Sequence, residues 1–99
     1  MAENSQVRWS HIAHEDLQLS LDFIQTQWNA AVAAKFLHAI DAKIKLLTKS
    51  PFVGSPSAYL PDCRKTLVPP YHALIYRVTH DDFEIVRLFD LRQDPSKLK

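Results

Sequence analysis

Basic and imidazole side chains gather in the last third of this 99-residue chain, in a combination that could cleave RNA without a metal ion. Such cleavage needs a base that activates the 2′-hydroxyl, cations that stabilise charge on the phosphate, and an acid for the leaving oxygen. His72 could act as the base, and Arg64, Lys65 and Arg92 could supply the other roles. These four residues are the candidate catalytic set if the chain is a ribonuclease. The same region also holds Arg77 and Arg87, and either Tyr71 or Tyr76 could join this set.

A structural interpretation of the same cations stays open beside the catalytic one. Arg92 and Asp94 could fold the C-terminal tail back against a sheet. Arg77 and Arg87 could lie on the solvent face of that sheet and pair with Glu84. Under this interpretation the cations hold the fold together and the chain is not an enzyme.

Other catalytic chemistries have little support in the sequence. His11 and His14 are three residues apart, but a metal site needs three or four converging ligands and no second cluster has zinc spacing. Cys63 has cations beside it that could activate a thiol, yet it stands at the start of a predicted strand. Gly54 is the only glycine, so a glycine-rich phosphate loop is excluded. We therefore expect neither a metal nor a cofactor.

The charge of the chain is nearly balanced, which bears on its partners. Twelve Lys and Arg face eleven Asp and Glu, a formal net charge of +1. Residues 1–62 hold five basic and six acidic groups, whereas residues 63–99 hold seven and five, so the C-terminal part carries +2. Proteins that dock on bare nucleic acid usually present a stronger basic patch, because each phosphate contact releases counterions. We expect no strong direct binding to nucleic acid.

The composition favours a cytoplasmic protein. The single cysteine cannot form an internal disulfide, which fits a reducing compartment. No apolar run approaches the roughly 20 residues of a membrane span, and the start, residues 1–6, lacks the basic region and apolar core of a signal peptide. We treat residues 1–99 as one domain.

Two apolar stripes predict a helical hairpin that would position the candidate residues from one side. Ser10 is suited to cap the first helix, Asn29 can cap the second, and Ser50-Pro51 ends it. Apolar residues recur at helical spacing in both segments. The first stripe is Ala13, Leu17, Leu21, Ile24 and Trp28, and the second is Ala33, Phe36, Leu37, Ile40, Ile44 and Leu47.

Four β-prone segments complete the predicted fold: 6–9, 64–68, 72–78 and 83–89. Short turns at Pro69-Pro70 and at 80–82 make the last three antiparallel neighbours, and we expect the first to join antiparallel to the last. The result is an α+β domain, β-α-α-β-β-β in two layers, with the hairpin on a four-stranded antiparallel sheet of order 1-4-3-2. The predicted core between the layers contains Leu17, Ile24, Phe36, Ile40, Ile75 and Ile85 or Val86.

An ordered set of short motifs spans nearly the whole chain. It begins with Val7-Arg8-Trp9-Ser10 and Asp16-Leu17, continues through Trp28, Phe36 and Ile40, and ends with Phe89-Asp90-Leu91-Arg92-Gln93-Asp94-Pro95 after three β-prone runs. This order resembles the RelE/ParE family of toxins from bacterial type II toxin–antitoxin systems, which includes plasmid stabilisation proteins. The resemblance implies the same two-layer fold and a cognate antitoxin that neutralises the toxin.

Within the resembled family, one branch poisons DNA gyrase and another cleaves messenger RNA on the ribosome. Ribonuclease members carry an arginine near the start of the central strand and often a tyrosine or histidine near the C-terminus. Here His72-Ala73 stands at the first place, and neither residue type follows Arg92. These departures and the near-neutral charge favour the ParE-like branch, a growth-inhibiting toxin that occupies a protein target such as gyrase. The alternatives are a metal-independent, ribosome-dependent endoribonuclease and a non-toxic module that modulates an antitoxin's DNA binding.

An antitoxin partner would need both charged and apolar contacts. Arg64, Lys65 and Arg92 are expected to pair with an acidic partner, and Asp94 lies in the same tail. Trp and Tyr favour interfaces, and the chain holds more large aromatic residues than a small core must bury. The predicted partner-binding residues are therefore Arg64, Lys65, Arg92, Asp94, Trp28 and Tyr71.

Overall fold

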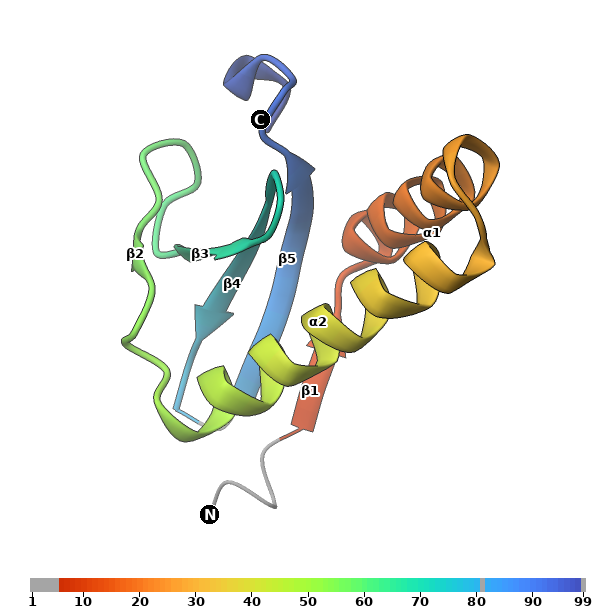
Figure 1. Cartoon of the computed structure of the whole chain (residues 1–99). Coiled ribbons are helices and arrows are strands. Elements are labelled where there is room, and N and C mark those ends of the chain that lie inside the picture. The colour runs from red at the N-terminus through yellow and green to blue at the C-terminus, as the bar shows by residue number, and fades with distance from the viewer. Residues whose placement is uncertain (1–5, 81, 99) are drawn as a thin grey trace.

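The computed structural model describes residues 6–80 and 82–98. Residues 1–5, whose composition argued against a signal peptide, and Asp81 of the predicted turn lie outside the described residues. The elements follow in the order β1 (Gln6–Trp9), α1 (His11–Gln27), α2 (Ala30–Lys49), β2 (Ser55–Pro56), β3 (Arg64–Val68), β4 (His72–Val78) and β5 (Asp82–Asp90). A short 3-10 helix, Pro95–Leu98, follows β5. The predicted α+β fold is confirmed: two helices cover one face of a sheet (Figure 1).

Both helices begin where the sequence predicts, at side chains that satisfy free backbone donors. The Ser10 hydroxyl accepts a hydrogen bond from the Ala13 amide at 2.9 Å, and the Asn29 side chain accepts one from Val32 at 2.9 Å. These are N-caps, which replace bonds that the first helical turn cannot make within the helix.

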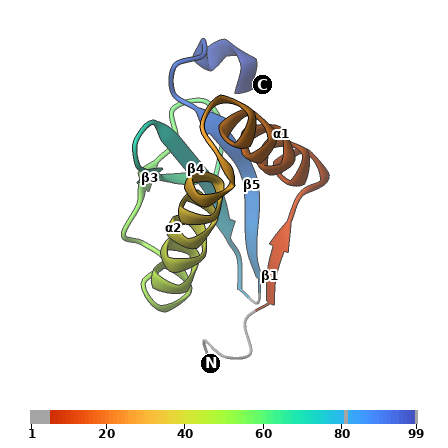
Figure 2. The same cartoon turned by 45° about the vertical axis from the view of Figure 1, so that its right-hand side comes forward.

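The sheet has the order β1-β5-β4-β3-β2. The predicted order of the four longer strands is confirmed, and β2, two residues long, adds a fifth strand beside β3. One part of the prediction is wrong, because β1 pairs parallel with β5. Only Ser10 separates β1 from α1, so the helix runs onward from the strand instead of turning back (Figure 2). The helical hairpin returns the chain to its starting direction, so β1, β3 and β5 all run the same way.

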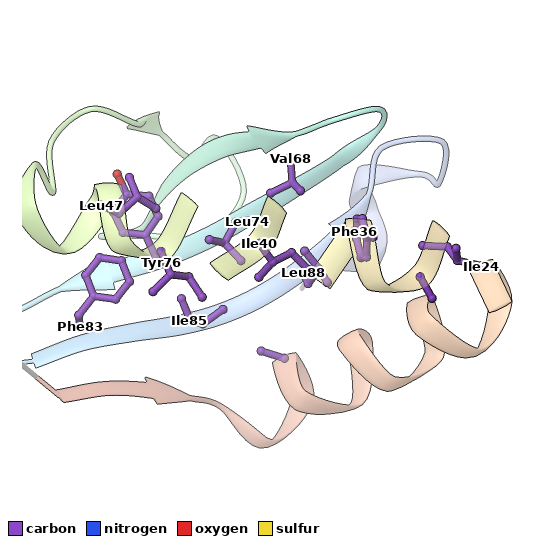
Figure 3. Close-up of a cluster of buried hydrophobic side chains, with 13 residues drawn as sticks. Ile24, Phe36, Ile40, Leu47, Val68, Leu74, Tyr76, Phe83, Ile85 and Leu88 are labelled. Atoms are coloured by element: carbon purple, nitrogen blue, oxygen red, sulfur yellow. The ribbon is translucent and has the colours of Figure 1, made fainter. Parts of the chain in front are cut away.

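The main core lies between the helices and the sheet. Ile24, Phe36, Ile40 and Leu47 project from the helices toward Leu74, Tyr76, Ile85 and Leu88 of the sheet (Figure 3). Side chains alternate between the two faces of a strand.

Parts of the predicted core lie elsewhere. Since Leu74 and Tyr76 face the helices, Ile75 faces away from them and joins a second buried cluster with Cys63, Phe89 and Leu98. Placing Ile75 under the helices was therefore wrong. Leu17 and Val86 are only partly buried. In the described ranges, no helix is long and apolar enough to cross a membrane.

Candidate functional site

His72, the proposed base, is buried at 3% exposure. It is the first residue of β4 and faces the helices. Its ring packs near two aromatic rings, with centroids 4.6 Å from Phe36 and 5.2 Å from Tyr71. The imidazole is therefore part of the packed interior rather than an exposed catalytic group.

One hydrogen bond holds the His72 ring. Its Nε2 lies 3.2 Å from the hydroxyl of Ser20 on α1, whereas Nδ1 is buried and has no partner among the described residues. Burial lowers the pKa of His72 below its ordinary value of 6.5, against the opposing effect of Asp90 and with a smaller contribution from Arg92. The ring is thus held in its neutral form near pH 7.

Arg92 lies beside His72 but is bound to a carboxylate. Its Nε and Nη2 donate to the two oxygens of Asp90 at 3.0 and 2.7 Å, and its backbone amide donates to the same carboxylate at 2.9 Å. The bidentate pair lowers the pKa of Asp90. The guanidinium also lies 3.8 Å from the ring centroid of Tyr71 and 5.6 Å from that of Phe23.

These residues line a groove of about 320 Å³ between α1 and the end of β5. We call it the His72 groove and define it by Leu19, Ser20, Phe23, His72, Asp90 and Arg92. It contains a neutral imidazole and a cation whose charge is matched by Asp90. A cation that is free to stabilise charge on a phosphate would have to come from the substrate or from another protein.

Arg64 lies at the other end of the β3–β4 pair, because it is opposite Tyr76 whereas His72 is opposite Val68. Its guanidinium donates to the carbonyl of Gly54, from Nε at 3.0 Å and from Nη2 at 2.7 Å, and to the carbonyl of Phe52 at 3.2 Å. Lys65 follows it on β3, opposite Ile75, and is exposed. The predicted catalytic set is therefore not brought together: His72 and Arg92 meet, and Arg64 and Lys65 lie apart from them.

The remaining basic residues of the sheet have structural partners. Arg77 donates to Glu84 at 3.3 Å, as the structural interpretation predicted. Arg87 instead binds Asp16 of α1 through Nε at 2.8 Å and Nη2 at 3.1 Å, so its predicted pairing with Glu84 is wrong. The Asp16 carboxylate also accepts the amide of Leu88 at 3.0 Å. This amide lies beyond the point where β1 ends, so α1 supplies the missing acceptor.

A second groove of about 420 Å³ adjoins the first at Ile24 and is largely apolar. We call it the Trp28 groove and define it by Trp28, Val32, Lys35, Pro69, Pro70 and Tyr71. Trp28 is 67% exposed. Of the predicted partner-binding residues, Trp28 and Tyr71 line this groove and Arg92 lies against Tyr71. Asp94 accepts the amide of Ser96 at 3.0 Å in the tail.

Four residues that define the His72 groove were missed by sequence reasoning: Leu19, Ser20, Phe23 and Asp90. Ser20 could have been found, because it lies three residues after Leu17 and four before Ile24, on the inward stripe of α1. The stack of Phe23 on Arg92 depends on how the tail turns after β5, which no spacing encodes.

Cys63 is buried in the second cluster, and burial raises the pKa of its thiol. His11 pairs with Glu15 at 3.0 Å on the exposed side of α1.

Residues 7–95 match the family model described as the ParE toxin of the type II toxin–antitoxin system parDE. The chain belongs to the ParE toxin family. Among curated proteins, none matches this ParE-family chain.

Solved structures share its fold, including the following three. A chain from "Chromosomal ParDE TA system from P. aeruginosa" superimposes with a TM-score of 0.76 at 21% identity, over 89% of this chain and 97% of that one. A chain of the E. coli DinJ–YafQ toxin–antitoxin complex gives 0.58 at 17% identity, over 88% and 92%. A mutant of E. coli YafQ gives 0.58 at 18% identity, over 89% and 94%.

Proposed function

We propose that this ParE-family chain is a cytoplasmic toxin that a cognate antitoxin neutralises and that inhibits growth by binding a protein target such as DNA gyrase. The proposal rests on the paired charge and the burial of the residues in the His72 groove. Cleavage of a phosphodiester needs a cation that is free to stabilise developing charge. Arg92, the cation that shares the groove with His72, is matched by Asp90, and the imidazole is 3% exposed.

An antitoxin partner is supported by the apolar surface beside the His72 groove. The Trp28 groove offers an exposed indole and Tyr71, residue types that anchor protein partners, beside two prolines. Solved structures with this fold include toxins described together with their antitoxins, ParDE of P. aeruginosa and DinJ–YafQ of E. coli. We propose that a segment of the antitoxin covers the Trp28 groove.

The decisive experiment separates target occupation from RNA cleavage. The chain is expressed with and without its antitoxin, and growth, nucleoid shape and mRNA 5′ ends are recorded. We expect growth arrest with altered nucleoids and no new mRNA ends. Purified toxin should inhibit supercoiling by gyrase, and His72→Gln, which preserves a polar partner for Ser20, should inhibit equally well.

The ribonuclease remains the second candidate, because His72, Asp90 and Arg92 do share one groove. If it is correct, new mRNA ends appear on expression and vanish in His72→Gln while growth arrest is lost. A chain that binds antitoxin but arrests no cells would support the third candidate, a module that only modulates the antitoxin's DNA binding. Ser20→Ala removes the hydroxyl that contacts His72 Nε2 and controls for effects of local misfolding in the groove.

A further inference from the structure

The turn between α2 and β2, residues 51–54, presents two large apolar side chains to solvent. Phe52 is 70% exposed and Val53 is 59% exposed. We call these two residues the Phe52–Val53 turn. It lies where α2 leads into β2, at the opposite end of the fold from the C-terminal tail and the His72 groove (Figure 1).

Buried and half-buried side chains fix the backbone of this turn. The Tyr76 hydroxyl, on a fully buried residue, donates to the Pro51 carbonyl at 2.8 Å and accepts the Gly54 amide at 3.1 Å. Arg64 donates to the carbonyls of Phe52 and Gly54. The Val53 amide donates to the Ser50 carbonyl at 3.2 Å. Five backbone polar groups of four consecutive residues are thus bonded, so the turn is held in one conformation.

Gly54 makes this close attachment possible. A Cβ at this position would lie 2.5 Å from the Lys65 carbonyl oxygen and 2.6 Å from the Tyr76 hydroxyl. Only glycine therefore allows the turn to approach β3 and the tyrosine this closely. The same attachment leaves Phe52 outside, with the Arg64 guanidinium 5.2 Å from its ring centroid.

The surroundings of the turn are basic. Arg64, whose guanidinium lies over Phe52, donates to backbone carbonyls of the turn. Lys49 precedes the turn, Lys65 lies on β3 opposite Ser55, and the sequence has no Asp or Glu between Asp41 and Asp62. Asp82 lines a small cavity with Pro51, but it is paired with Arg8 at 3.0 Å. An apolar projection beside cations that have no carboxylate partner among the described residues complements an apolar pocket that carboxylates surround.

The shape of this surface favours a folded partner. A rigid convex projection loses little conformational freedom on binding and needs a preformed pocket, whereas the concave Trp28 groove suits an inserted segment. We propose that the Phe52–Val53 turn is the contact by which this toxin engages its acidic, folded protein target, and that it is separate from the antitoxin surface. This inference rests on the proposed function, since it assigns a surface to the target.

The test measures growth inhibition and antitoxin affinity on the same variants of the full chain. Phe52→Ser should raise the amount of toxin needed for half-maximal growth inhibition by about tenfold or more, the effect of losing one aromatic anchor. Its Kd for the antitoxin encoded beside the toxin should change less than twofold, and its melting temperature should stay near that of the wild type. Phe52→Leu, which keeps apolar bulk, should retain most of the inhibition.

Two further variants test charge and specificity. Lys49→Glu combined with Lys65→Glu should weaken growth inhibition, because it reverses the charge around the turn. Leu67→Ser removes a half-exposed apolar side chain of β3 and is the matched control, with both readouts expected at wild-type values.

Inhibition by Phe52→Ser at wild-type potency would overturn the inference and leave the proposed function standing. Loss of antitoxin affinity in the same variant, with an unchanged melting temperature, would also overturn it, because the antitoxin would then occupy the turn. A wild-type chain that arrests no cells would instead overturn the proposed function.

Discussion

Arg64 and His72 lie at opposite ends of one antiparallel strand pair: Arg64 is opposite Tyr76, and His72 is opposite Val68. Four residues of a strand span roughly 13 Å, and each side chain is bound to neighbours at its own end of the pair. Each has a role where it stands. Arg64 fixes the turn after α2, and His72 packs between α1, α2 and β4. The two candidate catalytic residues therefore stabilise opposite ends of the sheet.

The first prediction concerns the core beneath α2. Phe36 is 6% exposed and packs against both the sheet and the His72 ring. Phe36→Ala should lower the free energy of unfolding by about 3–5 kcal/mol, since it leaves a cavity that the surroundings fill only in part. Thermal and urea denaturation measure the effect. Leu37→Ala, at a neighbouring exposed position, should cost much less; equal losses in the two variants would contradict the packing described.

The second prediction concerns the ion pair that ties α1 to β5. The side chains of Asp16 and Arg87 are 14% and 18% exposed. Asp16→Ala leaves the guanidinium without its partner and the Leu88 amide without its acceptor, so we expect a loss of roughly 3–5 kcal/mol in unfolding free energy. Asp41→Ala removes an exposed carboxylate that lies 3.9 Å from Lys45 and should cost about 0.5 kcal/mol or less.

An unaffected urea midpoint in Asp16→Ala would show that the pair adds nothing to the fold. The double variant Asp16→Ala with Arg87→Met should be more stable than Asp16→Ala alone, because it removes the unpaired charge as well.

Local patterns predicted the elements of this fold well. The stripes through Ile24, Phe36 and Ile40 depend only on helical periodicity, and the caps Ser10 and Asn29 act within one turn. The direction of β1 depends instead on whether the chain reverses at Ser10. The site of Arg64 depends on a turn that folds back onto β3 from ten residues upstream. Such relationships arise from tertiary contacts, which no spacing in the sequence encodes.

The charges of the candidate site also depend on tertiary contacts that the sequence does not reveal. The sequence places Asp90 two residues before Arg92, but whether the two pair depends on the turn that follows β5. The neutral state of His72 depends on its burial, to which Phe36 and Tyr71 contribute although they are 35 residues apart in the chain. A motif can therefore identify residue types for catalysis without fixing their protonation or their partners.

The third prediction is a pH dependence of stability that arises from His72. Its pKa in the folded protein lies below the ordinary value of 6.5 because of burial. As the pH falls below 6.5, the unfolded chain takes up a proton that the folded chain does not, so the free energy of unfolding decreases. Urea unfolding of the wild type at pH 7.5 and pH 5.5 should show this decrease, and His72→Gln should show a smaller one.

The control for this slope is His38→Gln, at an exposed position of α2. It should keep the full wild-type decrease. The lowered pKa of Asp90 acts in a different range, because the stability it contributes is lost only as the pH falls below 3.8. A wild-type slope in His72→Gln would mean that the ring titrates alike in the folded and unfolded chain.

The last prediction concerns the antitoxin surface. Trp28 is 67% exposed at the end of α1, so Trp28→Ala should change the melting temperature little. Exposed tryptophans at the centre of an interface often contribute 2 kcal/mol or more to binding, and a loss of about 2 kcal/mol corresponds to roughly a 30-fold weaker Kd. Calorimetric titration of the antitoxin into the purified variant measures this change. Because the Trp28 groove and the Phe52–Val53 turn lie on different elements, Trp28→Ala should still arrest growth, and co-expressed antitoxin should rescue the cells less well. Full rescue together with a wild-type Kd would place the antitoxin on another face of the toxin.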